Sequence, residues 1–267
     1  MLCCKDNIIF NHFESRGYTV TNAQEPTDFS FLQKLSFTIV QNLPQINKLL
    51  KAIRQCIPYP DSNGTRRFSY LLEEPEEEKN IIRKTVQDFT HFGLLLSSNI
   101  EEDTISGIVN PMPRTTRFIT GQWLEIYAAC ITQDIVSSFA AEHQLPYSVL
   151  TNVELKKNGK LAHEIDCFFS VGSSVFATEQ KGGNFNNYLH LHEIGKSLGI
   201  IPDHYLLLQT SLTDLEQMDL LQYFYQFYIC NLSTFSDKLR AMLKQVETDS
   251  IDVVRGFCLL IYQLNKG

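Results

Sequence analysis

Glu179 and Lys181 lie two residues apart in the segment ATEQKGG (177–183), and their types and spacing could serve catalysis. In a strand, residues two apart project from the same face, so the carboxylate and the ammonium would lie side by side. The preceding positions on that face, Val175 and Ala177, are apolar. A charged pair that ends an apolar face needs a polar pocket or the sheet margin. The alternative is a solvated surface pair without a function, and the surrounding residues have to decide.

A second carboxylate lies in the preceding predicted strand, at Asp166 in the segment HEIDCFF (163–169). The turn Gly172-Ser173 makes the two strands a hairpin, which can bring Asp166 level with Glu179. Glu164 shares a face with Asp166 and is the alternative ligand or a partner of the ligand, although we favour Asp166. Two carboxylates and a lysine at the end of adjacent strands can bind a hard divalent cation and place an amine beside a metal-bound water.

A third carboxylate, Glu125, comes early in the predicted helix GQWLEIYAACITQDIVSSFAAE (121–142). If this helix packs on the strands, its first turns can present Glu125 to the same pocket. A helix glutamate that faces solvent is the alternative.

The order of these residues resembles the PD-(D/E)XK, or restriction endonuclease-like, nuclease superfamily. The matching segments are GQWLE, HEID and ATEQKGG, and their sequences most resemble the nuclease domain of CRISPR ancillary nucleases that carry a CARF sensor domain. The resemblance covers about residues 100–210. It implies that Asp166 and Glu179 hold Mg²⁺ or Mn²⁺, with help from Glu125 through a second ion or a water. It also implies that Lys181 orients the attacking water and stabilises charge on the phosphate.

The chain departs from the family pattern at three points. Ile165 stands where the motif has proline, and Gln180 stands where a small or apolar residue is expected, although Gln180 should face the opposite side of the strand. The first 100 residues show no alternation of strands and helices typical of a CARF domain, so control by a cyclic oligonucleotide is not implied.

Further polar side chains near the motif are candidate substrate contacts. The lysines of KKNGK form a predicted hairpin tip, and the others lie after the motif or on the following helix. Exposed turns often carry lysines without a function, and His190 and His192 in HLH would point to different sides of a helix. The candidates are Lys156, Lys157, Lys160, Asn184, Tyr188 and His190.

The pattern of apolar residues predicts an α/β (α+β) fold, with helices packed on a mixed sheet that contains a three-strand meander. A mainly helical region, 1–99, should precede a nuclease-like domain, 100–267. Residues 1 to about 60 read as helical, and a further helix is predicted from Glu76 to about Ser97. The predicted strands are 104–110, 116–120, 148–155, 161–171, 174–181 and 204–210, and a helix is predicted at about 184–198.

The composition is that of a globular protein, with 43% hydrophobic and 20% charged residues. The longest apolar run, Phe257 to Leu264, is too short to cross a membrane, and the N-terminus does not read as a signal peptide. The seven cysteines have no zinc spacing and indicate buried thiols in a reducing compartment, so we expect a cytoplasmic protein. The net charge of −7 weakens a nuclease hypothesis without excluding it, because binding responds to the local field.

We therefore expect a Mg²⁺- or Mn²⁺-dependent endonuclease that cleaves nucleic acid, DNA rather than RNA, in defence against foreign nucleic acid. A homodimer is expected because cutting two strands takes two such sites. One alternative is a non-catalytic binding or assembly module on the same fold, and another is a metal-dependent hydrolase of small phosphate esters.

Overall fold

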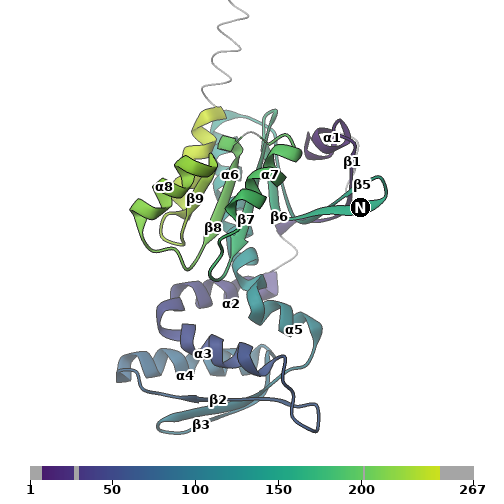
Figure 1. Cartoon of the computed structure of the whole chain (residues 1–267). Coiled ribbons are helices and arrows are strands. Elements are labelled where there is room, and N and C mark those ends of the chain that lie inside the picture. The colour runs from purple at the N-terminus through teal and green to yellow at the C-terminus, as the bar shows by residue number, and fades with distance from the viewer. Residues whose placement is uncertain (1–7, 27–29, 201, 247–267) are drawn as a thin grey trace, which may run out of the picture. The chain divides into compact units, whose positions relative to one another are not determined.

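The structure, a computed structural model, describes residues 8–26, 30–200 and 202–246 (Figure 1). Cys3, Cys4, Cys258 and the run Phe257 to Leu264 lie outside the described residues. Of the helices that the structure describes, none has the length and apolar character needed to cross a bilayer. The chain divides into two compact units: unit 1 comprises Met1–Asp28 and Ala128–Gly267, and unit 2 comprises Phe29–Tyr127.

Unit 1 is built on a six-stranded mixed sheet with the order β1-β5-β6-β7-β8-β9. Strands β5, β6 and β7 form an antiparallel meander, and β8 and β9 then add in parallel to β7. Each parallel connection contains a helix, as parallel neighbours require. The strands are β1 (Tyr18–Gln24), β5 (Tyr147–Lys157), β6 (Lys160–Val171), β7 (Ser174–Lys181), β8 (Tyr205–Gln209) and β9 (Tyr228–Cys230). The helices are α1 (Ile8–Glu14), α7 (Tyr188–Ser197), η4 (Pro202–His204) and α8 (Leu215–Tyr225), followed by helical residues 235–246.

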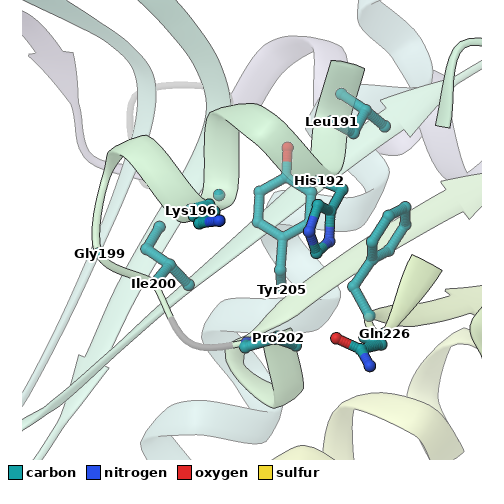
Figure 2. Close-up of a pocket in the computed structure, with 10 residues that line it drawn as sticks. Leu191, His192, Lys196, Gly199, Ile200, Pro202, Tyr205 and Gln226 are labelled. Carbon is teal, nitrogen blue, oxygen red and sulfur yellow. The ribbon is translucent and has the colours of Figure 1, made fainter. Parts of the chain in front are cut away.

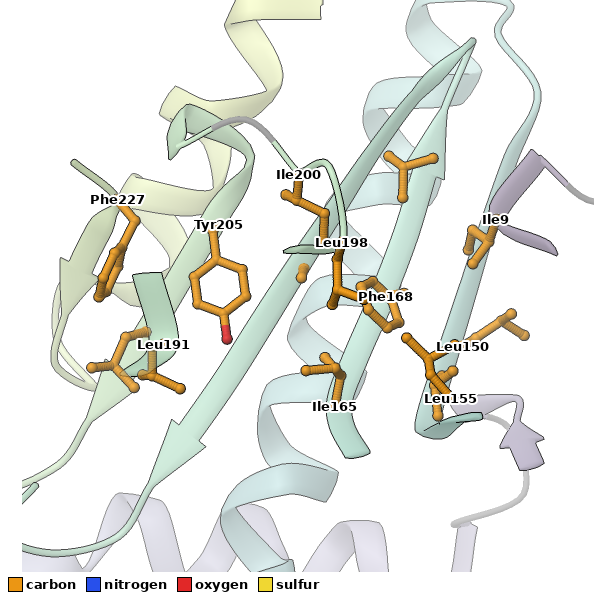
Figure 3. Close-up of a cluster of buried hydrophobic side chains, with 14 of the residues drawn as sticks. Ile9, Leu150, Leu155, Ile165, Phe168, Leu191, Leu198, Ile200, Tyr205 and Phe227 are labelled. Carbon is orange, nitrogen blue, oxygen red and sulfur yellow. The ribbon is translucent and has the colours of Figure 1, made fainter. Parts of the chain in front are cut away.

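The central strands of this sheet are buried on both faces, which explains their nearly continuous apolar sequences. Every residue of β8 is buried, and in β7 only the two terminal residues are partly exposed. On one face, side chains of α1 and α7 pack against the strands in a single cluster that includes Phe168 and Tyr205 (Figure 3). Charged side chains in this part of the sheet are therefore enclosed and need specific partners.

Unit 2 contains a three-stranded antiparallel sheet with the order β2-β4-β3 and several helices. Its strands are β2 (Arg66–Leu71), β3 (Leu95–Ile100) and β4 (Thr104–Val109). Its helices are α2 (Ser30–Gln41), α3 (Leu43–Cys56), α4 (Glu76–His91), α5 (Pro113–Arg117) and the π-helical turn η3 (Phe118–Gln122). Helix α6 (Trp123–His143) begins in unit 2 and continues into unit 1.

The predicted fold class, a mixed α and β fold with a meander flanked by helices, is confirmed. The meander strands and the helices α6 and α7 lie within a few residues of their predicted bounds. The predicted strand 116–120 is wrong, because these residues are helical. Pro113 begins that helix at a position where its missing N–H costs nothing, and the Thr120 hydroxyl donates to the Thr116 carbonyl one turn earlier.

The region 1–99 contains strands as well as helices. The segments YTVTNAQ and LLSSNI are β1 and β3, although the first was predicted as helical and the second overlaps the end of the helix predicted up to about Ser97. The predicted division near residue 100 falls between β3 and β4, which pair with each other in one sheet. The compact units instead divide after Asp28 and Tyr127.

Candidate active site on strands β6 and β7

The pairing of β6 with β7 places Asp166 beside Glu179. Their ladder runs from Val171 opposite Ser174 to Cys167 opposite Thr178, so Asp166 and Glu179 are the next residues on the two strands. Beyond this point the Gln180 N–H donates to Asp166 Oδ2 at 2.8 Å. The carboxylate thus takes up a backbone donor just where the backbone ladder ends, and this bond fixes its position.

Lys181 completes a compact cluster with the two carboxylates. Its Nζ lies 2.7 Å from Glu179 Oε2 and 3.9 Å from Asp166 Oδ2. The Glu179 side chain is only 4% exposed, whereas those of Asp166 and Lys181 are 18% and 32% exposed. The cluster is therefore open to solvent on one side and closed around Glu179.

When both carboxylates are ionised, the charges in this cluster do not balance. Burial, followed by the charge of Asp166, raises the pKa of Glu179 to about 8, and the Lys181 ammonium offsets only part of this effect. Two carboxylates share one ammonium in a place where water screens poorly. Additional positive charge at this point would stabilise the ionised form of both acids.

A divalent cation fits this requirement. Hard cations such as Mg²⁺ prefer carboxylate oxygens, and the two converging oxygens come from Asp166 and Glu179. Among the described residues there is no cluster of three or more His, Cys, Asp or Glu side chains arranged to hold a metal ion. A cation held by this pair would thus draw its remaining ligands from water or substrate.

Gln209 supports the site, although the sequence reasoning did not single it out. It is the parallel partner of Lys181 on β8, and it is buried. Its Oε1 accepts a hydrogen bond from the Tyr188 hydroxyl at 2.9 Å, and its Nε2 donates to the Phe185 carbonyl at 3.3 Å and the Ser211 hydroxyl at 3.0 Å. These bonds tie the loop after Lys181 to the end of β8. The one signal in the sequence is a polar residue that ends the apolar run YLLLQ.

Gln180 is buried, and the strand alternation directs it to the opposite face from Glu179 and Lys181, in agreement with the prediction. Its Nε2 donates to the Thr178 hydroxyl at 2.8 Å, and its Oε1 has no hydrogen-bond partner within the described part of the chain. It therefore belongs to the packing behind the site.

Tyr205, the first residue of β8, is also enclosed near the carboxylates. It is 1% exposed, and its hydroxyl has no hydrogen-bond partner among the residues that the structure describes. Its ring lines a cavity of about 360 Å³ together with residues of α7 and the connection between α8 and β9, among them His192, Lys196 and Gln226 (Figure 2). The described lining of this cavity does not include the cluster of Asp166, Glu179 and Lys181.

The third predicted carboxylate, Glu125, lies in the first turn of α6 and belongs to unit 2. It lines a hollow of about 210 Å³ with Arg117, Thr120, Gly121 and Gln122. Its participation with residues of unit 1 stays a prediction.

The candidate substrate contacts lie in different surroundings. Lys157 and Lys160 are exposed on either side of the β5–β6 turn, Lys156 is half-buried, and the Lys157 ammonium stands 4.7 Å from the centre of the Tyr18 ring. Asn184 and His190 are exposed. The remaining candidate, Tyr188, is buried and its hydroxyl is engaged by Gln209, so its first role is to hold the loop.

No protein-family model matches the chain, and no curated protein matches it. Solved structures do. Protein VC1899 from Vibrio cholerae is 13% identical with a TM-score of 0.61, over 89% of this chain and 60% of its own. Can2 from Sulfobacillus thermosulfidooxidans, solved in complex with cyclic tetra-adenylate, is 12% identical with a TM-score of 0.57, over 88% of this chain and 61% of its own.

The chain shares their fold. It spans about 60% of the length of each of these proteins. At this level of identity the likeness concerns the arrangement of helices and strands, and any activity has to be argued from the residues of this chain.

Proposed function

We propose that this protein is a Mg²⁺- or Mn²⁺-dependent nuclease of the PD-(D/E)XK type that hydrolyses phosphodiester bonds in nucleic acid, DNA rather than RNA. The observation that carries the proposal is the cluster of Asp166, Lys181 and the buried Glu179, in which two carboxylates, when ionised, face the Lys181 ammonium. The sequence resemblance to CRISPR ancillary nucleases, together with the fold shared with Can2, supports a role in defence against foreign nucleic acid.

In this proposal Asp166 and Glu179 hold the cation, and Glu125 assists from the start of α6. A bound Mg²⁺ or Mn²⁺ would lower the pKa of the water that it coordinates and stabilise charge on the phosphate. Lys181 lies beside Glu179, where its ammonium can orient the attacking water and contact the phosphate oxygens. Gln209 keeps the loop that follows Lys181 in place. Hydrolysis adds a water oxygen to phosphorus and breaks the bond to the departing sugar oxygen.

Cleavage of plasmid and single-stranded DNA and of RNA in Mn²⁺ and Mg²⁺ tests this function. Asp166→Ala, Glu179→Ala and Lys181→Ala should each lower cleavage by about 100-fold or more, since each removes a group that stabilises charge in the transition state. Glu142→Gln, which alters an exposed carboxylate on α6, is the control and should cleave like wild type. Cleavage at the wild-type rate by all three alanine variants would refute the assignment.

A non-catalytic binding or assembly module on the same fold is the second candidate. The net charge of −7 favours it, because a nucleic-acid enzyme usually carries a basic surface. Calorimetric titration with Mn²⁺ separates the two. Binding heat that the wild type gives and Asp166→Ala does not give supports the nuclease. A wild-type protein that shows neither binding heat nor stabilisation by Mn²⁺ supports the inert module.

We also propose that the active form is a homodimer in the cytoplasm. Cleavage of both strands of a duplex takes two sites, and light scattering during size-exclusion chromatography measures the mass directly. The thiols of Cys56, Cys130, Cys167 and Cys230 are unpaired, which is compatible with a reducing compartment.

A further inference from the structure

The orientation of Tyr205 relates it to the proposed metal ligands. It pairs in parallel with Ala177, and Glu179 pairs with Leu207 two residues further along, so Tyr205 and Glu179 project from the same face of neighbouring strands. Figure 3 shows the Tyr205 side chain among the buried apolar side chains that cover this face of the sheet.

The hydroxyl of Tyr205 lacks the partner that its burial demands. The residue is 1% exposed, its ring packs edge-on against Phe227 with 5.5 Å between centroids, and no described atom accepts or donates at the oxygen. Most buried side-chain polar atoms in proteins have a hydrogen-bond partner, and an unpaired one weakens the fold. A phenylalanine would supply the same packing, so the oxygen needs a separate explanation.

The surrounding charges define what the hydroxyl can do. Burial, followed by the charges of Glu179 and Asp166, raises the pKa of Tyr205 well above its ordinary value, so the oxygen keeps its proton and is available as a donor. Lys181 binds one oxygen of the Glu179 carboxylate, Oε2. A donor from the β8 side would hold the other oxygen, Oε1.

We propose that Tyr205 is a positioning residue whose hydroxyl donates a hydrogen bond to Glu179 Oε1, directly or through one water, when the site binds its cation. This inference rests on the proposed metal-dependent function and deepens it. With Lys181 and Tyr205 on its two oxygens, the Glu179 carboxylate has one orientation for the cation. Groups that orient metal ligands in this way typically contribute 10- to 100-fold to metal affinity.

The test compares Tyr205→Phe with Tyr228→Phe. Both substitutions remove only a hydroxyl from the same sheet, but Tyr228 lies on β9, where its oxygen accepts a hydrogen bond from Gln245 at 2.9 Å. We expect Tyr205→Phe to bind Mn²⁺ about tenfold more weakly in calorimetric titration. Its cleavage should need correspondingly more Mn²⁺ and approach the wild-type maximum when Mn²⁺ saturates. Tyr228→Phe should bind Mn²⁺ like wild type.

Urea unfolding in the absence of metal supplies a second readout. If Tyr205→Phe binds Mn²⁺ as tightly as wild type and is also more stable in urea, the hydroxyl is a buried group without a partner, and the inference is overturned while the nuclease proposal stands. A wild-type protein that neither binds Mn²⁺ nor cleaves nucleic acid overturns both. Weaker Mn²⁺ binding by Tyr205→Phe, with a metal-free protein that is at least as stable as wild type in urea, supports the inference.

Discussion

Replacing Glu179 by glutamine should stabilise the metal-free protein while it abolishes metal-dependent cleavage. Glu179 is 3% exposed and stands beside a second carboxylate, Asp166, so its ionised form is costly in the absence of a cation. Glutamine has nearly the same shape and no charge. The substitution therefore removes the cost of the charge and leaves the packing of β7 in place.

The size of the effect depends on pH. The pKa of Glu179 is about 8 in the folded protein and 4.5 in an unfolded chain, so the folded state holds the proton more tightly. The proton on Glu179 therefore stabilises the folded state. This contribution is fully present below about pH 4.5, decreases as the pH rises, and is lost above about pH 8. The difference between the two pKa values sets an upper limit of roughly 5 kcal/mol on the contribution of this proton to the free energy of unfolding. Because glutamine forfeits the ion pair with Lys181, a net gain on the order of 1–3 kcal/mol is expected at pH 9 and almost none at pH 5.

Urea unfolding at pH 5, 7 and 9 in the presence of a chelator measures this difference. Glu164→Gln is the control, because it makes the same chemical change at an exposed position of β6. The stability gap between Glu179→Gln and wild type should widen with pH, whereas the gap for Glu164→Gln should stay within about 0.5 kcal/mol of zero. A variant at position 179 that is less stable than wild type at pH 9 would show that Lys181 fully compensates the carboxylate.

Two further predictions concern the proton on Glu179 and the loop behind Lys181. Since a cation displaces that proton, the affinity for Mn²⁺ should rise about tenfold per pH unit up to about pH 8 and level off at higher pH. Calorimetric titration in buffers of different ionisation heat should detect the released proton. An affinity that does not change between pH 6 and 8 would contradict the raised pKa of this group. Gln209→Leu leaves the buried Tyr188 hydroxyl unpaired, so it should lower the free energy of unfolding by about 1–3 kcal/mol. It should also increase protease cleavage in residues 182–187. The control Gln222→Leu on α8 should leave that loop as resistant to protease as in wild type.

The sequence predicted the geometry of Asp166 and Glu179 because a short turn fixes it. With Gly172 and Ser173 between the strands, the register of the hairpin is set locally, and counting along both strands brings the two carboxylates level. The same count places Gln180 on the opposite face. These relations involve residues that are near in sequence, and no distant part of the chain can alter them without breaking the turn.

Other features depend on partners far away in sequence and were not predicted. Gln209 reaches Lys181 through a parallel pairing, whose register is set by the packing of a helix and not by a turn. Strand β1 pairs with β5 across more than 100 residues. The segment TRFIT is rich in β-branched and aromatic residues that favour a strand, but the helix that begins at Pro113 continues through it.

The burial of Glu179 argues against the interpretation of the Glu-x-Lys spacing as a solvated surface pair. A solvated surface pair would be exposed on both sides and would contribute little to stability. Here the lysine is one-third exposed while the glutamate is enclosed, and a second carboxylate bonded to the Gln180 N–H adds negative charge at the same point. A fold that only needed packing at position 179 would be more stable with an uncharged side chain. In the proposed function, this arrangement is a cation site that is in place before the cation binds, and the protein gives up some stability for it.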